Sequence, residues 1–202
     1  MLFAAFREDP EGHPLRTPSG RIELYSETVA SFGYDDAPGH AAWLEPSEWL
    51  GSPRAARFPL HLIANNPARR LHSQLDHGEH SQAGKVQGRE PIRLHPDDAA
   101  ARAIADGDVV RVFNDRGACL AGAVLDGALS AGVAQLSTGA WYDPADPAED
   151  EPLCVHGNVN VLTPDRGTSR LAQGCSGQHV LVQVARHDGA LPPIRAYEAP
   201  AG

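Results

Sequence analysis

Polar side chains that could bind a planar, anionic ligand follow the first core strand predicted in the chain. Arg70, His72, Ser73 and Gln74 supply a guanidinium, an imidazole, a hydroxyl and a carboxamide within five residues. A guanidinium binds phosphate with a bidentate fork, and the three neutral groups match the donors and acceptors on the edge of a heteroaromatic ring. Because loops at strand ends often hold ligands, the segment 70–74 predicts a binding site. The alternative is a polar surface loop with an incidental histidine.

A second set of amides lies in the last third of the chain. Asn158 and Asn160 flank Val159, so in a strand both carboxamides point to the same side. Such a pair could bind the edge of a planar heterocycle, or it could satisfy the backbone of a neighbouring loop. Gln178 adds a carboxamide after the bend 174–177, where a ligand could approach backbone amides.

Other motifs that could carry chemistry are weaker. The bend 174–177 reads Gly-Cys-Ser-Gly, but no strand-turn-helix elbow surrounds it, so no catalytic nucleophile is predicted. His72, His77 and His80 lie in a polar, unpatterned stretch, which favours solvated histidines over a metal site. The chain contains neither the Gly-x-Gly-x-x-Gly fingerprint of dinucleotide-binding folds nor a P-loop.

The elements that must position these residues are organised around residues 91–122. A strand is expected at the start of this stretch, then a helix opened and capped by the proline and two aspartates of 96–98, then a strand at 109–113. Gly107 can take the positive φ that ends the helix, and 114–117 has the composition of a hairpin turn.

Further strands are predicted at 58–64, 120–125, 132–137 and 180–184 from their apolar alternation. The stretch 75–90 lacks periodicity and is interpreted as a surface loop. About six short strands with one or two short helices favour a mainly β fold, and a small closed barrel removes the exposed strand edges.

The two ends of the chain differ from its middle. Prolines interrupt residues 1–57, where only 21–25 has strand character, so this part looks like an irregular segment that packs on something else. Residues 186–202 form a Pro-rich tail. We therefore expect a barrel domain at 58–185 between an interdomain segment and a C-terminal tail.

Composition limits the classes of function. The net charge of −9 argues against a nucleic-acid surface, which needs clustered Lys and Arg, and Lys85 is the only lysine. Three cysteines without a Cys-x-x-Cys pair argue against a disulfide framework and a zinc site. No apolar run approaches the ~18 residues of a membrane span. Because the N-terminus has neither a signal-peptide core nor a twin-arginine pair, we expect a cytoplasmic protein, or a periplasmic one if a missing N-terminal part carries that signal.

Six motifs, taken together and in order, resemble the C-terminal part of the dimethyl-sulfoxide reductase family of molybdoenzymes. The region 39–51 is most similar to the biotin sulfoxide reductase subfamily. The motifs occupy 17–23, 70–74, 105–117, 141–144, 157–162 and 167–174.

This resemblance implies a double-psi β-barrel that closes over two molybdopterin guanine dinucleotides, the bis-molybdopterin guanine dinucleotide cofactor. It implies that Asn66 and His72 face the pterin, and that Asn160 and Gln178 add cofactor contacts from the second half of the chain. Asn158 is added to these candidates because its carboxamide is expected to point the same way as that of Asn160. Arg70, Ser73 and Gln74 would support phosphate or pterin contacts. Asn66 stands where some relatives carry His, and Arg170 stands where many carry Lys.

The function implied is the cofactor-binding domain of a biotin sulfoxide, dimethyl sulfoxide or trimethylamine N-oxide reductase. The serine that ligates molybdenum in this family lies upstream of the motifs found here. The chain is therefore expected to need upstream domains as partners and to be inactive alone. The alternative is a free-standing double-psi barrel that acts as a binding or adaptor subunit, although such a module would have no reason to keep the motif at 17–23.

Overall fold

The computed structural model describes residues 2–150, 153–174, 177 and 180–199. The chain divides into two compact units, one formed by 46–166 with 175–202 and the other by 1–45 with 167–174. The domain boundaries expected after residues 57 and 185 remain predictions.

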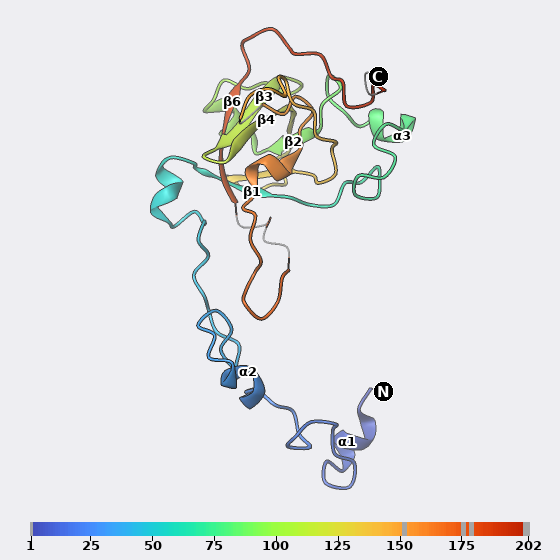
Figure 1. The fold of residues 1–202 in the computed structure, drawn as a ribbon, viewed down its shortest axis with the longest axis vertical. Coiled ribbons are helices and arrows are strands. Elements are labelled where there is room, and N and C mark those ends of the chain that lie inside the picture. Colours follow the sequence, from blue (N-terminus) through green and yellow to red (C-terminus); the bar gives the residue numbers. More distant parts are fainter. Residues whose placement is uncertain (1, 151–152, 175–176, 178–179, 200–202) are drawn as a thin grey trace. The chain divides into compact units, whose positions relative to one another are not determined.

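The larger unit is built around a closed barrel of six strands in the order β1-β5-β2-β4-β3-β6 (Figure 1). Short helices and long connections surround it, so the predicted mainly β class is confirmed. The strands found among the described residues are β1 (Leu60–Ile63), β2 (Pro91–Leu94), β3 (Val109–Asn114), β4 (Gly117–Leu125), β5 (Val133–Leu136) and β6 (Val180–Arg186).

The strand pairing has an internal two-fold pattern. β1 runs parallel to β5, and β2 runs parallel to β4, while the other four neighbouring pairs are antiparallel. Exchanging β1, β2 and β3 with β4, β5 and β6 leaves the set of pairs unchanged. Two interlocked three-strand units produce such a pattern, which supports the double-psi assignment; the crossing of its loops stays a prediction.

The core fills the barrel interior. In β1 and β5 buried and partly exposed residues alternate, as expected for strands with one face inward. β4 is buried along most of its length, and one of its edges is bridged by Cys154: Leu120 N donates to Cys154 O at 2.8 Å, and Cys154 N donates to Ala118 O at 3.1 Å.

Three of the short helical segments described, α3, α4 and η2, lie between strands, and the other three precede β1. The helix predicted after residue 95 is present as α4, Gly107 has φ +85°, and the hairpin at 114–117 joins β3 to β4. The N-cap of α4 is His95, whose Nδ1 accepts from Asp97 N at 3.2 Å, so the predicted aspartate cap is wrong. The helical segments described are α1 (Ala4–Glu8), α2 (Glu27–Ser31), η1 (Pro53–Ala56), α3 (Glu79–Gln82), α4 (Pro96–Ala100) and η2 (Val159–Leu162).

Two other local predictions are wrong. The stretch 75–90 is not a surface loop: it contains α3 and buries Asp76, Ser81 and Glu90, because ion pairs compensate its polarity. Residues 21–25 form no strand, since the described chain offers them no partner strand.

The smaller unit has almost no interior. Ala37 is its only buried residue among those described. Within the unit, Arg170 stacks on the Tyr34 ring at 4.8 Å and pairs with Asp35 and Asp36. In neither unit is any described helix long and apolar enough to cross a bilayer.

Candidate functional site

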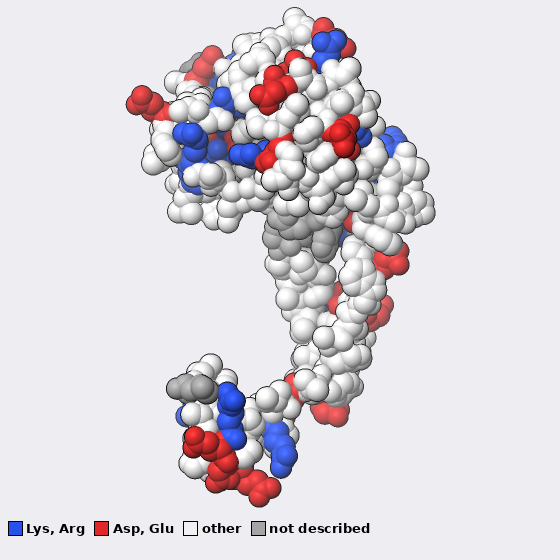
Figure 2. All heavy atoms as spheres, turned by 180° about the vertical axis from the view of Figure 1, so that it is seen from behind, with Lys and Arg blue, Asp and Glu red and all other residues white. Residues whose placement is uncertain are grey.

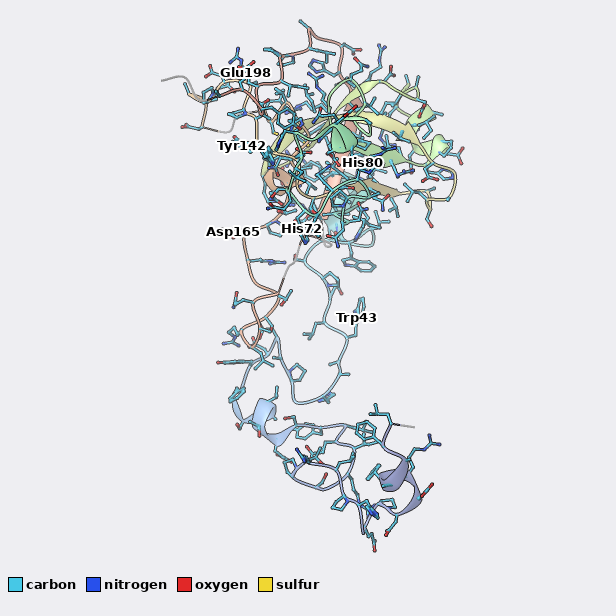
Figure 3. The ribbon with its side chains drawn as sticks, turned by 90° about the vertical axis from the view of Figure 1, so that its right-hand side faces the viewer. Trp43, His72, His80, Tyr142, Asp165 and Glu198 are labelled. Atoms are coloured by element: carbon cyan, nitrogen blue, oxygen red, sulfur yellow. The ribbon has the colours of Figure 1, made fainter. Side chains whose placement is uncertain are left out.

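A hollow of about 430 Å³ brings together side chains from three separate segments of the larger unit. Figure 3 labels two of its residues, His72 and Tyr142. Four predicted binding residues meet here: His72 and Ser73 from the loop after β1, and Asn158 and Asn160 from the η2 turn. The full lining is His72, Ser73, Thr138, Gly139, Ala140, Trp141, Tyr142, Asn158 and Asn160.

The hollow presents neutral polar groups. None of its described lining residues carries a carboxylate, in a chain whose net charge is −9. The His72 ring, the Ser73 and Tyr142 hydroxyls and the Asn160 amide have no hydrogen-bond partner among the described residues. These groups remain available to a ligand, and the volume falls within the range of about 300–1,000 Å³ usual for small-molecule sites.

The loop carrying His72 has a conformation held by its neighbours. His72 has φ +51°, in the left-handed region that few non-glycine residues adopt. Its carbonyl accepts a hydrogen bond from Arg70 Nε at 2.9 Å. A Cβ on Gly139, which has φ +90°, would lie 2.0 Å from this carbonyl oxygen, so only glycine fits there.

Asn158 and Asn160 reach the hollow in a way the sequence did not predict. The expected strand is the η2 helix, a 3-10 turn, and Asn158 is its N-cap. Asn158 Oδ1 accepts from Asn160 N at 2.9 Å, which is the local backbone satisfaction weighed above as the alternative. Both residues nevertheless line the hollow.

Arg70 is turned away from solvent and donates to the backbone of two loops that line the hollow. Its side chain is 4% exposed and pairs with Asp76 at 3.3 Å and Glu90 at 3.1 Å. Its Nη2 donates to Thr138 O at 2.9 Å. Arg70 therefore ties together the two loops that carry His72 and Gly139, and its contact with a phosphate stays a prediction.

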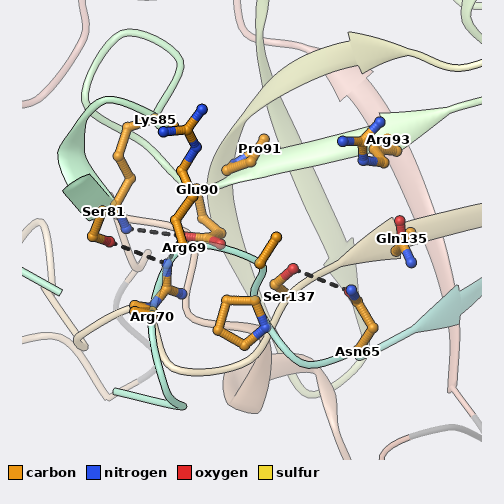
Figure 4. A pocket seen from close by; sticks show the side chains of 13 residues that line it. Asn65, Arg69, Arg70, Ser81, Lys85, Glu90, Pro91, Arg93, Gln135 and Ser137 are labelled. Carbon is orange, nitrogen blue, oxygen red and sulfur yellow. Dashed lines mark hydrogen bonds and ion pairs between the residues drawn. The ribbon is translucent and has the colours of Figure 1, made fainter. Parts of the chain in front are cut away.

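Arg70 belongs to a buried cluster of balanced charge with Asp76, Lys85 and Glu90; Figure 4 shows Arg70, Lys85 and Glu90. Lys85 Nζ lies 2.8 Å from both Asp76 Oδ1 and Glu90 Oε2, and its side chain is 1% exposed. The two cations and two carboxylates sum to zero, which is the condition under which buried ions are tolerated. Burial alone would raise the pKa of Asp76, but Lys85 and Arg70 outweigh burial and hold that pKa below its ordinary value.

His156 and Tyr197 extend this cluster to the backbone of the hollow. The ring of His156 is fully buried, with Nδ1 3.0 Å from Trp141 O and Nε2 2.8 Å from the Tyr197 hydroxyl. A carbonyl only accepts, so Nδ1 carries the hydrogen. Burial lowers the pKa of His156, and the Lys85 ammonium lowers it further, so the ring is neutral at pH 7.

Trp141 is thereby fixed at several points. Its backbone N donates to Asp76 Oδ2 at 3.2 Å, and its indole Nε1 donates to Ser73 O at 2.9 Å. The segments that carry Ser73, Asp76 and His156 therefore all bind to Trp141.

A second charged pair, Glu48 with Arg116, contacts the end of the η2 turn. Glu48, 6% exposed, accepts from Arg116 Nη1 at 2.6 Å and from the backbone N of Leu181 at 2.8 Å. Arg116 Nε donates to Leu162 O at 2.7 Å, at the end of η2. Burial raises the pKa of Glu48, but the Arg116 and Leu181 hydrogen bonds outweigh it, and the net shift is downward.

A second pocket, of about 310 Å³, is lined in part by the cluster residues Arg70, Lys85 and Glu90 (Figure 4). Arg69 and Arg93 contribute exposed guanidiniums to it, and Lys85 and Glu90 line its interior. Of the predicted ligand contacts that the structure describes, Arg70 alone lines this pocket.

Two of the remaining predicted residues, Asn66 and Gln74, lie elsewhere. Asn66 is exposed, and its carbonyl accepts from Asn65 Nδ2 at 2.9 Å. Gln74 is exposed and closes a turn through its backbone N to Leu71 O at 2.8 Å. Neither lines the hollow, and Gln178 lies outside the described residues. A role in binding cofactor stays a prediction for all three.

Comparison with protein families identifies the fold and its ligand class. The family model described as "Molydopterin dinucleotide binding domain" matches residues 60–181, more than half of the chain. The chain belongs to this family. The resemblance predicted from the six motifs is confirmed, together with molybdopterin dinucleotide as the cofactor class.

Curated relatives of this molybdopterin dinucleotide binding domain are reductases. It is 50% identical over 202 residues to the dimethyl sulfoxide/trimethylamine N-oxide reductase of Cereibacter sphaeroides, covering all of this chain and 24% of the relative. It is 52% identical over 198 residues to the biotin sulfoxide reductase of the same organism, covering 98% and 26%. Trimethylamine-N-oxide reductase 1 of Escherichia coli is 50% identical over 192 residues, covering 94% and 23%. The chain thus spans about a quarter of the length of these relatives.

A solved structure supports the architecture. Acetylene hydratase from Pelobacter acetylenicus superposes with a TM-score of 0.66 over 89% of this chain and 25% of that chain. At 21% sequence identity this likeness shows the fold alone.

The donor set of the hollow fits the cofactor that the family implies. A molybdopterin dinucleotide combines heteroaromatic rings with an anionic pyrophosphate link. His72, Ser73, Asn158 and Asn160 would hold ring edges, and the absence of carboxylates from the described lining leaves no like charge facing the link.

Sequence reasoning missed the residues that support this site. The sequence interpretation places Asp76, Lys85 and Glu90 in a surface loop and Tyr197 in a Pro-rich tail, and it gives His156 no role. One signal was available, because Lys85 is the only lysine in a chain that otherwise uses arginine.

Proposed function

We propose that this domain binds part of a bis-molybdopterin guanine dinucleotide cofactor in a sulfoxide or N-oxide reductase, as the C-terminal domain of that enzyme. The observation that carries the proposal is the carboxylate-free hollow, in which His72, Ser73, Asn158 and Asn160 meet. The substrate class comes from the reductases to which the chain is about 50% identical.

The residues of this chain bind and orient, and other groups perform the reaction. When bound, the cofactor supplies the redox chemistry that removes oxygen from a sulfoxide or N-oxide. His72 and the two asparagines offer neutral groups to a ring edge, while Arg70 and Trp141 fix the loops around them. No residue of this chain is proposed as a molybdenum ligand.

Replacing His72 in the native protein tests the site. We expect His72→Ala to lower the molybdenum and the guanine nucleotide retained per protein by about 5- to 10-fold, the effect of losing one hydrogen bond of ordinary strength. His80→Ala is the matched control, because His80 is exposed and lies outside the hollow (Figure 3). Equal molybdenum and nucleotide content in both variants and the unmodified protein would remove His72 from the site.

The partners proposed are the upstream domains of the same enzyme. This follows from the length of the relatives, and an immunoblot of the source cells tests it. A product several times longer than 202 residues that co-elutes with molybdenum is expected. A product of the length of this chain, free of molybdenum, would favour the stand-alone binding subunit.

Nucleic acid is not proposed as a partner, and the proposed compartment is the cytoplasm. The face seen in Figure 2 intersperses both signs of charge and presents no continuous cationic surface, in a chain of net charge −9. Fractionation of the source cells tests the compartment, and recovery in the periplasm would indicate an upstream export signal.

A further inference from the structure

The C-terminal segment 192–197 closes over the larger unit and ends at the buried charge cluster. Its first fixed point is Pro192 O, which accepts from Arg89 Nη2 at 2.8 Å. Arg89 is itself 3% exposed. We call residues 192–197 the C-terminal strap.

Asp143 provides the second fixed point of the strap. This carboxylate is 4% exposed, and its Oδ2 accepts from the backbone N of Arg195 at 2.6 Å and of Ala196 at 2.9 Å. Asp143 follows Trp141 and Tyr142, so the strap is bound to the loop that lines the hollow.

The strap delivers one side chain into the interior. The Tyr197 hydroxyl lies 3.0 Å from Asp76 Oδ2 and 2.8 Å from His156 Nε2. The Tyr197 ring packs edge-on against His156 at 5.1 Å and tilted against Trp141 at 5.5 Å. Its single hydroxyl hydrogen therefore lies between two acceptors.

Those two acceptors hold the backbone of Trp141 on both sides. Asp76 Oδ2 accepts from Trp141 N, and His156 Nδ1 donates to Trp141 O. The hydroxyl has one hydrogen to donate, so its removal either takes a hydrogen bond from Asp76 Oδ2 or leaves His156 Nε2 as a buried acceptor with no described donor. Either loss falls on a group that holds Trp141.

We propose that Tyr197 is a positioning residue for the hollow, acting from the C-terminal strap through Asp76 and His156 on Trp141. The functional consequence rests on the proposed cofactor role of the hollow. The structural link from Tyr197 to Trp141 stands without it.

Amide hydrogen exchange of the 202-residue chain, followed by NMR, tests the link with no cofactor present. Tyr197→Phe removes only the hydroxyl and keeps the ring contacts. We expect the exchange of the Trp141 amide to accelerate about 10- to 100-fold, the loss expected when a hydrogen bond to a charged group is removed. The indole resonance of Trp141, whose Nε1 donates to Ser73 O, should shift.

Two further variants make the outcome specific. Asp143→Asn weakens the anchor without changing Tyr197, so it should reproduce the faster exchange in part. Tyr25→Phe, in the smaller unit, should leave Trp141 unchanged. Trp141 exchange within twofold of the unmodified chain in Tyr197→Phe would overturn the proposal. So would a uniform acceleration that includes Val112 in β3, because it would mean general destabilisation.

The native protein then separates this inference from the proposed function. If Tyr197→Phe accelerates exchange of the Trp141 amide and also lowers molybdenum retention, the positioning role and the proposed function both hold. If Trp141 responds and the native protein contains no molybdopterin nucleotide at all, the positioning role holds and the proposed function fails.

Discussion

Removing the positive charge of Lys85 should destabilise the barrel more than any single surface change. Lys85 Nζ lies 2.8 Å from carboxylate oxygens of Asp76 and Glu90, and all three side chains are at most 3% exposed. Lys85→Met keeps most of the volume but leaves two buried carboxylates facing Arg70 alone. Breaking a buried ion pair in this way costs about 3–5 kcal/mol, a large share of the ~5–15 kcal/mol that stabilises a typical domain.

A second substitution should restore part of the loss. Glu90→Gln added to Lys85→Met removes the uncompensated carboxylate and leaves the Arg70–Asp76 pair at 3.3 Å. The double variant should be more stable than Lys85→Met alone, by about 1–3 kcal/mol, because the two sites interact directly. Additive losses from the two substitutions would refute the charge-balance argument.

Urea unfolding of the 202-residue chain at pH 7, followed by circular dichroism, measures these differences. Arg93→Met is the control, because its pair with Asp126 at 3.0 Å is half-exposed on the arginine side. An exposed pair contributes at most about 1 kcal/mol. A loss below about 1 kcal/mol for Lys85→Met would show that the cluster is solvated in solution.

Three further perturbations report on other parts of the structure. The pKa of His156 is lower in the folded than in the unfolded state, because burial disfavours the charged ring. Acidification from pH 6.5 should therefore lower the free energy of unfolding by up to about 1.4 kcal/mol per pH unit. Urea titrations of His156→Gln at the same pH values should lack this slope. Gly139→Ala places a Cβ 2.0 Å from the His72 carbonyl oxygen and should reduce molybdenum retention in the native protein, whereas Gly127→Ala, with no atom within 4 Å of its added Cβ, should retain the metal. Glu48→Gln removes a buried partner of Arg116 and should lower the free energy of unfolding by about 2–4 kcal/mol; a change below ~0.5 kcal/mol would contradict the role given to it.

The barrel strands could be predicted because each carries its own signal. Apolar alternation in β1, β2 and β5 reports which side faces inward, and this requirement is local to each strand. The residue types typical of turns also predict the hairpin at 114–117 and the positive φ of Gly107. The closed strand order could not be read from such patterns, since it depends on pairings between segments far apart in the sequence.

Four residues that line the hollow could be singled out from the sequence, because His72, Ser73, Asn158 and Asn160 carry suitable chemistry in their own side chains. Their support was not predicted. Buried ions such as Asp76 look like surface residues in a sequence, because only their partners make burial tolerable. The C-terminal strap could not be predicted for a similar reason: it has no periodicity, and Tyr197 is held by contacts with residues more than 40 positions away.

Hydrogen exchange of the native protein with and without its cofactor tests the central claim most directly. The account predicts that bound cofactor slows exchange in segments 70–74, 138–142 and 158–160, which form the hollow. Protection confined to the pocket lined by Arg69 and Arg93, with those three segments unchanged, would contradict the assignment of the site.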